Sequence, residues 1–524
     1  MKKLFKAVLI ITCFTAVDRI LGFGFKIFLA RNLGEVNFGI YQVALSIFFV
    51  LLTFTTSGIP LIVSKITAIS RKKGDAKAES ATVTAALICS VILSIVICGL
   101  VLLIRNPIAG IFATRESMYL LLLMLPAVLF SGIYAAFRGN MWGRQRYVTV
   151  SVIELIEQIT RISIVVILAL LGFNILRITA ISLSIAMCLT AILCIACYFK
   201  RKGRLTNPKT YIKPLIKQAA PVTMIRASNT LVAGLISIVV PRLLQRTGLS
   251  VAESMAMFGS SVGMALPLIF LPITVVGSLS YVLIPSLSAA HASGDKQTVK
   301  TQVEGAISFS LVVAALFIPV FFALGQPLGL LVYNTPTPGR FIALSAFLLV
   351  PLAAESIVSS MMNALDLERQ SFVNYLIGAA IMFGLMYATG RHFRIEFLLL
   401  GMGIAWTFST FLDVIAIKKR TKIKLSSFLM PLLKCLVLVV PTVFVTRGLY
   451  FLMGNLPLAA RVIVPAVISL VFITLLSLVF NVIDLSVFFS GKPRKNRFNI
   501  FAKFRMKKKR RNFAKRPKNK KPVV

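Results

Sequence analysis

The sequence is dominated by apolar stretches of roughly 20 residues, each long enough to cross the hydrocarbon core of a bilayer as a helix. Hydrophobic residues make up 58% of the 524 residues, more than a soluble domain of this length needs. In lipid a helix satisfies its own backbone polar groups. The pattern therefore predicts an all-α polytopic membrane protein.

The spacing of these stretches predicts fourteen membrane helices. They are expected at 7–30, 38–64, 81–104, 118–137, 149–171, 177–198, 217–243, 255–285, 304–329, 341–363, 372–389, 396–417, 428–447 and 460–483. We expect an N-terminal lobe of six helices (1–200), a C-terminal lobe of six (201–425), two extra helices (426–485) and a basic disordered tail (486–524).

The chain is strongly basic, with 58 Lys and Arg against 16 Asp and Glu and a net charge of +42. Most of this charge lies in loops beside the predicted spans and in the tail, and no nucleic-acid motif accompanies it, so no nucleic-acid partner is expected. Lysines concentrate in alternate loops, such as 64–79 and 200–217, which predicts a bacterial plasma-membrane protein with both termini cytoplasmic. The tail is expected either to be solvated and to enforce topology, or to bind anionic lipids or a partner.

Short motifs recur at a nearly constant spacing. Gly74-Asp75 matches Gly294-Asp295 at an offset of 220 residues, and Arg144-Gln145 matches Arg369-Gln370 at an offset of 225. A near-constant offset is what gene duplication predicts. Two lobes with the same orientation, related by an axis along the membrane normal, are therefore expected.

The first span carries three charged residues, Asp18, Arg19 and Lys26. Offsets of three, four and seven place Arg19, Gly22, Phe23 and Lys26 on one helical face. A charge at membrane depth costs about 3 kcal/mol on insertion scales, so it usually faces protein or a water-filled cavity. We predict that Arg19 and Lys26 line a cavity, with snorkelling as the alternative for Lys26. Asp18 is predicted to take part in gating or ion coupling, with an internal ion pair as the alternative.

The seventh span, which would open the second lobe, carries Arg226. By analogy with Arg19 in the first lobe, Arg226 is predicted to face the same central cleft. The alternative is an arginine at the cytoplasmic interface.

The fifth span carries a polar stripe, Glu154, Glu157, Gln158 and Arg161, on one face. Glu157 and Arg161 have the i,i+4 spacing of an ion pair. Two interpretations remain open: an internal salt bridge, or a gating or ion-coupling carboxylate.

No nucleophile elbow, Walker motif or metal cluster is found in the sequence, so neither an enzyme nor a bound cofactor or metal is predicted. Cys194 and Cys197 form a CxxC inside an apolar span, where we expect them to act as small packing residues. Energy for transport would come from a gradient, the membrane potential or the substrate.

Three segments resemble a known family. Residues 19–34 read RILGFGFKIFLARNLG and residues 241–250 read PRLLQRTGLS. The third segment, residues 153–161, reads IELIEQITR and contains Glu154, Glu157 and Arg161. Together they resemble the stage V sporulation protein B family and its lipid II flippase relatives, within the multidrug/oligosaccharidyl-lipid/polysaccharide (MOP) exporter superfamily. The resemblance covers roughly residues 5–485.

This resemblance implies a fourteen-helix, two-lobe fold that works by alternating access on a polyprenyl-pyrophosphate-linked sugar. It also implies that the last two helices form a groove for the lipid tail. The first-helix cations of lipid II flippases carry over only to Arg19 and Lys26, because Phe25 stands where some relatives have a second arginine. The eighth span lacks the interior arginine that some relatives have.

The predicted function is export of a lipid II-like cell-wall precursor, linked to peptidoglycan of the spore cortex. Two alternatives remain open. One is a cation-coupled multidrug exporter of the same superfamily, which should favour an acidic cavity. The other is a non-transporting membrane scaffold that recruits cell-wall enzymes through the basic tail.

Overall fold

The computed structural model describes residues 2–422 and 426–480, so the predicted tail at 486–524 lies outside the described residues. The described part of the chain is helical, joined by short turns. The helices are α1 (Lys2–Thr56), α2 (Ile59–Lys73), α3 (Ala76–Leu103), α4 (Arg105–Ile111), α5 (Arg115–Gly143), α6 (Tyr147–Leu170), α7 (Ile175–Lys200), α8 (Lys209–Arg246), α9 (Val251–Phe258), the π-helix η1 (Gly259–Ala265), α10 (Leu266–Ala292), α11 (Lys296–Tyr333), α12 (Thr337–Ser345), the 3-10 turn η2 (Ala346–Leu348), α13 (Leu349–Ala364), α14 (Glu368–Thr389), α15 (Glu396–Thr421), α16 (Ser426–Leu452) and α17 (Leu458–Val479).

The predicted membrane fold is confirmed. Twelve helical stretches are long and apolar enough to cross a membrane. One of them, Cys13–Lys73, contains two spans because α1 bends at Gly34, whose φ of 70° lies in the left-handed region that favours glycine. The helix α6 adds another span-length segment, and it differs from the twelve because any 18 consecutive residues of it include the three charged residues Glu154, Glu157 and Arg161. These helices correspond one by one to the fourteen predicted spans.

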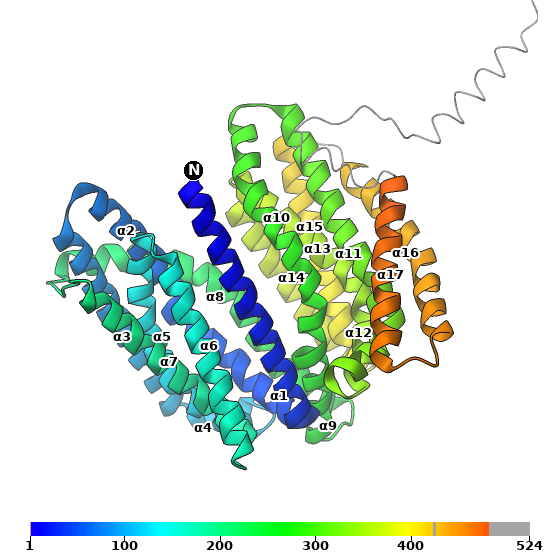
Figure 1. The fold of residues 1–524 in the computed structure, drawn as a ribbon, viewed down its shortest axis with the longest axis horizontal. Helices are drawn as coiled ribbons and strands as arrows, with labels where there is room; N and C mark the ends of the chain where they lie inside the picture. The colour runs from blue at the N-terminus through cyan, green and yellow to red at the C-terminus, as the bar shows by residue number, and fades with distance from the viewer. Residues whose placement is uncertain (1, 423–425, 481–524) are drawn as a thin grey trace, which may run out of the picture.

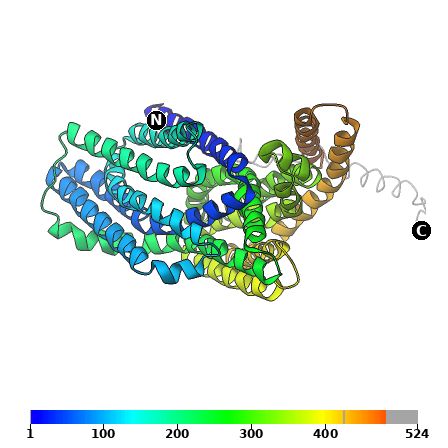
Figure 2. The same cartoon turned by 90° about the horizontal axis from the view of Figure 1, so that it is seen from below.

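The helices form two groups (Figure 1). One contains α1–α7 and the other α10–α17, and the first part of α1 runs between them. The helix α8 begins beside α2 and α3 and crosses toward α9, so it packs on the first group although it follows that group in sequence. In Figure 2 the last two helices, α16 and α17, lie at the outer edge of the second group.

The two groups converge at one side of the molecule and diverge at the other. We call the side where α1 begins and α5 and α7 end the N-terminal face, and the side where α1 bends at Gly34 the opposite face. In Figure 1 the ribbons of α1 and α10 separate toward the N-terminal face. They approach each other at the opposite face, where α1 packs against α9 and η1.

The contacts at the opposite face are close and polar. Arg31 donates hydrogen bonds from Nε to the Val332 carbonyl at 2.8 Å and from Nη2 to the Leu331 carbonyl at 2.7 Å. Thr335 donates to Glu35 at 2.5 Å. Beside them, Gly39 and Gly259 bring the backbones of α1 and η1 so near that a Cβ on either would collide with the other helix. This contact requires glycine at both positions.

The repeated Gly-Asp motif has the same structure in both halves. Gly74 (φ 74°) and Gly294 (φ 72°) each adopt the left-handed conformation. Asp75 then caps α3 by accepting from the Ala78 backbone at 2.8 Å, and Asp295 caps α11 by accepting from the Thr298 backbone at 3.0 Å. A left-handed glycine followed by an aspartate cap ends one helix and starts the next.

The second motif is repeated in a different register from the one expected. The turn after α5 has Gln145 in the left-handed region, and the equivalent residue after α13 is Asp366. In both turns the next backbone N–H bonds five residues back, from Arg146 to Met141 and from Leu367 to Met362. The structural offset between the two turns is therefore 221 residues, close to the offset of 220 of the Gly-Asp motif. Arg369-Gln370, which the sequence analysis paired with Arg144-Gln145, lies four residues beyond the structurally equivalent positions.

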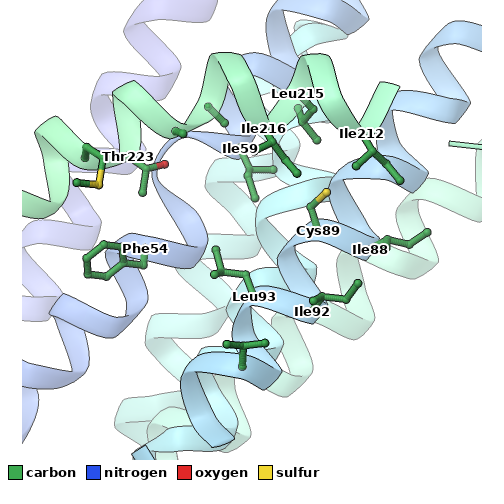
Figure 3. Close-up of a pocket in the computed structure, with 14 residues that line it drawn as sticks. Phe54, Ile59, Ile88, Cys89, Ile92, Leu93, Ile212, Leu215, Ile216 and Thr223 are labelled. Carbon is green, nitrogen blue, oxygen red and sulfur yellow. The ribbon is translucent and has the colours of Figure 1, made fainter. Parts of the chain in front are cut away.

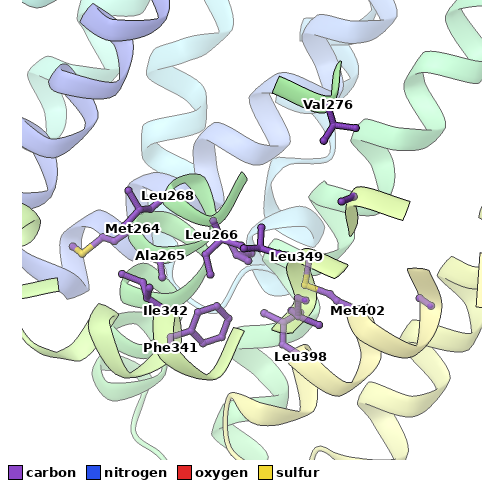
Figure 4. Close-up of a cluster of buried hydrophobic side chains, with 14 of the residues drawn as sticks. Met264, Ala265, Leu266, Leu268, Val276, Phe341, Ile342, Leu349, Leu398 and Met402 are labelled. Carbon is purple, nitrogen blue, oxygen red and sulfur yellow. The ribbon is translucent and has the colours of Figure 1, made fainter. Parts of the chain in front are cut away.

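The second group is held together by a dry apolar cluster (Figure 4). It brings residues of η1 and α10 against α12, α13 and α15, as with Met264, Phe341 and Leu398, which are nearly or fully buried. Exposed leucines on the outer surfaces, including Leu103 and Leu452, match the lipid contact expected of a membrane protein.

Candidate functional site

The first arm of α1 presents two cations, one of which, Arg19, interacts electrostatically with the adjacent Asp18. Arg19 is exposed and Lys26 is half-buried. Within the described residues neither side chain makes an ion pair or a hydrogen bond. Because α1 runs between the two helix groups, both cations belong to the helix that a substrate between the groups would meet.

The neighbouring face of α1 packs against α6. A Cβ on Gly22 would lie 3.4 Å from the Gln158 amide nitrogen, and the Arg161 guanidinium lies 5.5 Å from the centre of the Phe25 ring. Gly22 and Phe25 therefore face α6. At about 100° per residue, Phe25 lies about 100° around the helix from Lys26 and about 120° from Arg19. Gly22 lies between these directions, about 40° from Lys26 and about 60° from Arg19, so it borders both the α6 contact and the face predicted for the two cations.

The polar stripe of α6 is paired differently from the prediction. Glu154 accepts a hydrogen bond from the Tyr134 hydroxyl at 2.7 Å and forms an ion pair with Arg138 at 3.4 Å, both on α5. Arg161 donates to Gln158 on its own helix. The predicted Glu157–Arg161 ion pair is not formed, because Arg161 turns toward Gln158 and Phe25 instead.

This leaves a buried polar cluster between α1, α5 and α6. One Glu157 carboxylate oxygen, the Gln158 amide nitrogen and the Nε atoms of Arg138 and Arg161 are buried without a hydrogen-bond partner. Asp18 of α1 is half-buried and interacts electrostatically with Glu154 and Arg161. Buried polar atoms are normally paired, so these four unpaired atoms indicate a region that bound water, an ion or a different packing would stabilise.

Arg226 occupies a different place from the first-helix cations. It is exposed on α8, and its Nη1 donates to the Ser57 carbonyl at 3.4 Å, where α1 ends. Counting from the bend at Gly34 at 1.5 Å per residue, Ser57 lies about 34 Å along the second arm and Arg19 about 22 Å along the first. No direct contact joins Arg226 to Arg19 or Lys26 within the described residues, so the three cations form no contact cluster.

Two large apolar cavities open at the sides of the bundle. One of about 460 Å³ lies between the end of α1, α3 and the start of α8, with Phe54, Ile92 and Ile216 in its wall (Figure 3). The other, of about 410 Å³, lies between α11, α13, α15 and α16, with Leu432 and Leu436 contributed by α16. Neither is lined by Arg19, Lys26 or Arg226.

The sequence interpretation missed a second buried carboxylate site. Asp413 of α15 is 3% exposed and accepts hydrogen bonds from Ser371 at 2.9 Å and Asn374 at 2.7 Å on α14. Glu355 of α13, which had no assigned role, interacts electrostatically with Asp413. The available signal was an acidic residue inside a predicted apolar span, Glu355 in 341–363 and Asp413 in 396–417. No group of three or more metal-ligating side chains occurs among residues 2–422 and 426–480.

The chain is similar in sequence to known proteins. Residues 4–291 match the family described as polysaccharide biosynthesis protein. The chain is 26% identical over 397 residues to stage V sporulation protein B of Bacillus subtilis (strain 168), which covers 73% of this chain and 77% of the relative. It is 21% identical to sporulation protein YkvU of the same organism, over 81% of this chain and 97% of the relative.

Solved structures show the same fold. An inward closed conformation of the lipid II flippase MurJ matches with a TM-score of 0.67 at 14% identity, covering 90% of this chain and all of that one. An inward-facing multidrug resistance MATE family transporter of the MOP superfamily matches with a TM-score of 0.67 at 14% identity, over 77% and 94% of the two chains.

These matches confirm the predicted resemblance to the stage V sporulation protein B family, and the solved structures show that the chain shares their fold. The protein is a multi-pass membrane protein with the MOP fold, and it belongs to the polysaccharide biosynthesis protein family.

Proposed function

We propose that this protein is a flippase that moves a polyprenyl-pyrophosphate-linked saccharide, similar to lipid II, across the plasma membrane for peptidoglycan of the spore cortex. The observation that carries the proposal is the pair of cations Arg19 and Lys26 on α1, the helix between the two groups. Among the described residues neither side chain forms a hydrogen bond or a salt bridge. A pyrophosphate brought between the groups would form charge-assisted hydrogen bonds that offset its lost hydration.

The closed opposite face supports alternating access. Arg31 and Glu35 hold α1 to α11 and Thr335 at that face, whereas the ribbons diverge at the N-terminal face. If the N-terminal face is cytoplasmic, as the lysine distribution predicts, this conformation receives its substrate from the inner leaflet. Transport then requires the opposite-face contacts to break and the N-terminal face to close.

The prenyl chain needs an apolar path outside the headgroup site. The 410 Å³ cavity is lined mainly by aliphatic side chains and includes α16, one of the two extra helices. The position of this cavity on the second group would allow the prenyl chain to stay in or beside the lipid while the headgroup passes between the two helix groups. The 460 Å³ cavity on the first group would take ordinary acyl chains equally well.

In this mechanism Arg226 acts at the N-terminal end of the path rather than beside Arg19. Its hydrogen bond to the Ser57 carbonyl ties α8 to the end of α1, and exchange of that carbonyl for a phosphate oxygen would couple headgroup entry to movement of α8. The polar cluster of Asp18, Glu154, Glu157 and Arg161 is proposed as the gating or ion-coupling element, because a proton or a cation would satisfy the unpaired buried carboxylate oxygen of Glu157.

A cation-coupled multidrug exporter is the second candidate. It is favoured by the buried carboxylates Asp413 and Glu355 in the second group, which a cationic drug or coupling ion would neutralise. It is disfavoured by Arg19 and Lys26, which repel a cationic substrate at the helix it must pass.

A leaflet-accessibility assay with lipid II in reconstituted vesicles tests the proposal. Wild type is compared with Arg19→Ala, Lys26→Ala and Arg226→Ala, and with Lys217→Ala as a matched control, since Lys217 is an exposed cation on the same helix as Arg226. We expect Arg19→Ala and Lys26→Ala each to slow flipping at least about tenfold, the equivalent of one charge-assisted hydrogen bond, while Lys217→Ala matches wild type. Equal flipping by all five proteins would refute the site, and export of a cationic dye without lipid II flipping would favour the second candidate.

A further inference from the structure

Three helix ends meet in a basic pocket at the N-terminal face of the first group, away from the helices that would bind the transported headgroup. Arg144 follows α5, Arg146 precedes α6 and Arg201 follows α7. Together with Asn140, Thr149 and Tyr198 these arginines line one small cavity. We call these six residues the basic pocket.

The charges of the basic pocket are not balanced by the protein. The only carboxylate paired with it among the described residues is Glu79, which binds Arg144 and accepts from the Asn140 amide at 2.6 Å. Within the same described ranges the guanidinium groups of Arg146 and Arg201 make no hydrogen bond or ion pair. A fourth arginine, Arg71, approaches from α2 and donates to the Arg144 carbonyl at 3.4 Å.

The cations therefore repel one another. Burial lowers the pKa of Arg146 below its ordinary value, and the charges of Arg201, Arg144 and Arg71 lower it further. An anion bound at the mouth would relieve this repulsion and would supply acceptors for the free donors of Arg146 and Arg201. Arginine forks match phosphate oxygens in particular.

The size and surroundings of the pocket restrict the ligand. Its volume of about 10 Å³ admits roughly one water-sized group, so one phosphate oxygen enters and the rest of the ligand stays at the mouth. Val148 and Phe199, which precede Thr149 and follow Tyr198 of the pocket in sequence, are exposed apolar side chains. A free ion would leave these apolar side chains exposed, whereas the acyl chains of a lipid would cover them.

We propose that the basic pocket binds the phosphate of an anionic bilayer lipid, held by Arg146 and Arg201 at the N-terminal face. Such a lipid would brace the ends of α5, α6 and α7 while the two helix groups move relative to each other. The site is separate from the proposed flippase cations and does not depend on the identity of the transported molecule.

The test uses the full chain in nanodiscs of phosphatidylcholine with or without phosphatidylglycerol, at 0.15 M salt so that diffuse surface attraction is screened beyond about 8 Å. Native mass spectrometry then counts the phosphatidylglycerol molecules that remain bound. The double variant Arg146→Gln/Arg201→Gln is compared with wild type and with Lys419→Gln/Arg420→Gln, which removes the same charge from exposed positions at the end of α15.

We expect wild type and the α15 variant to retain one more phosphatidylglycerol than the pocket variant, whose affinity for that lipid falls about 30-fold through the loss of two cations. A parallel arm adds inorganic phosphate to phosphatidylcholine nanodiscs and measures the thermal unfolding midpoint. Equal lipid retention by all three proteins overturns the proposal, and so does stabilisation by inorganic phosphate with no preference for the lipid. Matching unfolding midpoints of the proteins in phosphatidylcholine alone show that the pocket variant is folded.

Discussion

The glycine contact at the opposite face makes a sharp prediction about transport. In Gly39→Ala the new Cβ would lie 3.0 Å from the Met255 carbonyl carbon and 3.2 Å from the Gly259 nitrogen, and closer still to the Met255 oxygen. All three atoms belong to backbone, so no side chain can move aside. Since comfortable carbon contacts begin at about 3.5 Å, the helices α1 and α9 must separate by roughly 1 Å.

Overpacking of this kind costs about 1–3 kcal/mol. The cost falls on the conformation with the opposite face closed and is absent once α1 and α9 part. A cost of about 2 kcal/mol changes the ratio of the two conformations about 30-fold. That is enough to reverse a tenfold preference for the closed opposite face.

The populations are measurable by pulsed electron resonance between spin labels at Glu116→Cys and His392→Cys, which are exposed at the opposite face in different helix groups. The seven native cysteines are first replaced. We expect Gly39→Ala to shift the distance distribution to longer values and to slow flipping. The matched control is Gly24→Ala on the same helix, where a Cβ meets nothing within 4 Å. If Gly39→Ala keeps the wild-type distances, the opposite-face contact is not a gate.

Three further predictions concern other parts of the molecule. Asp413→Ala leaves the buried donors of Ser371 and Asn374 unpaired, so it should lower the free energy of unfolding by about 1–3 kcal/mol, whereas the exposed Glu368→Ala should change the melting temperature little. Hydrogen bonds from the Thr298 side chain and backbone lower the pKa of Asp295 below its ordinary value, so the ionised Asp295 stabilises the fold above its unfolded-state pKa, and this stabilisation is lost as the pH falls through the folded-state pKa. The difference in melting temperature between wild type and Asp295→Ala should therefore shrink when the pH is lowered from 7. A difference that grows on acidification would contradict this reasoning. Outward movement of a pyrophosphate is favoured by about 2.3 kcal/mol per charge per 100 mV when the inside is negative. An inside-negative potential imposed with valinomycin should therefore bias lipid II toward the outer leaflet. If the distribution of lipid II does not respond to the potential, compensating cations move with the headgroup.

Local sequence patterns were sufficient to predict the helices, because apolar runs of span length depend only on hydrophobicity. The Gly-Asp pairs at 74 and 294 were recognised as a repeat, and the structure shows that they are left-handed glycines followed by aspartate caps, which depend on short-range hydrogen bonds. The same patterns marked α1 and α6 as the helices with polar faces. These properties belong to each helix alone, so the sequence determined them before any packing.

The pairing of polar residues depended on the tertiary structure. The partners of Glu154 are Tyr134 and Arg138, 20 and 16 residues earlier on α5, because the rotation of α6 points that carboxylate toward its neighbour. Arg226 meets Ser57 because α8 lies along the first helix group, and Asp413 meets Ser371 and Asn374 because α14 packs on α15. A helical periodicity gives the angle between two side chains of one helix, but only the packing of all helices decides which neighbour each face meets.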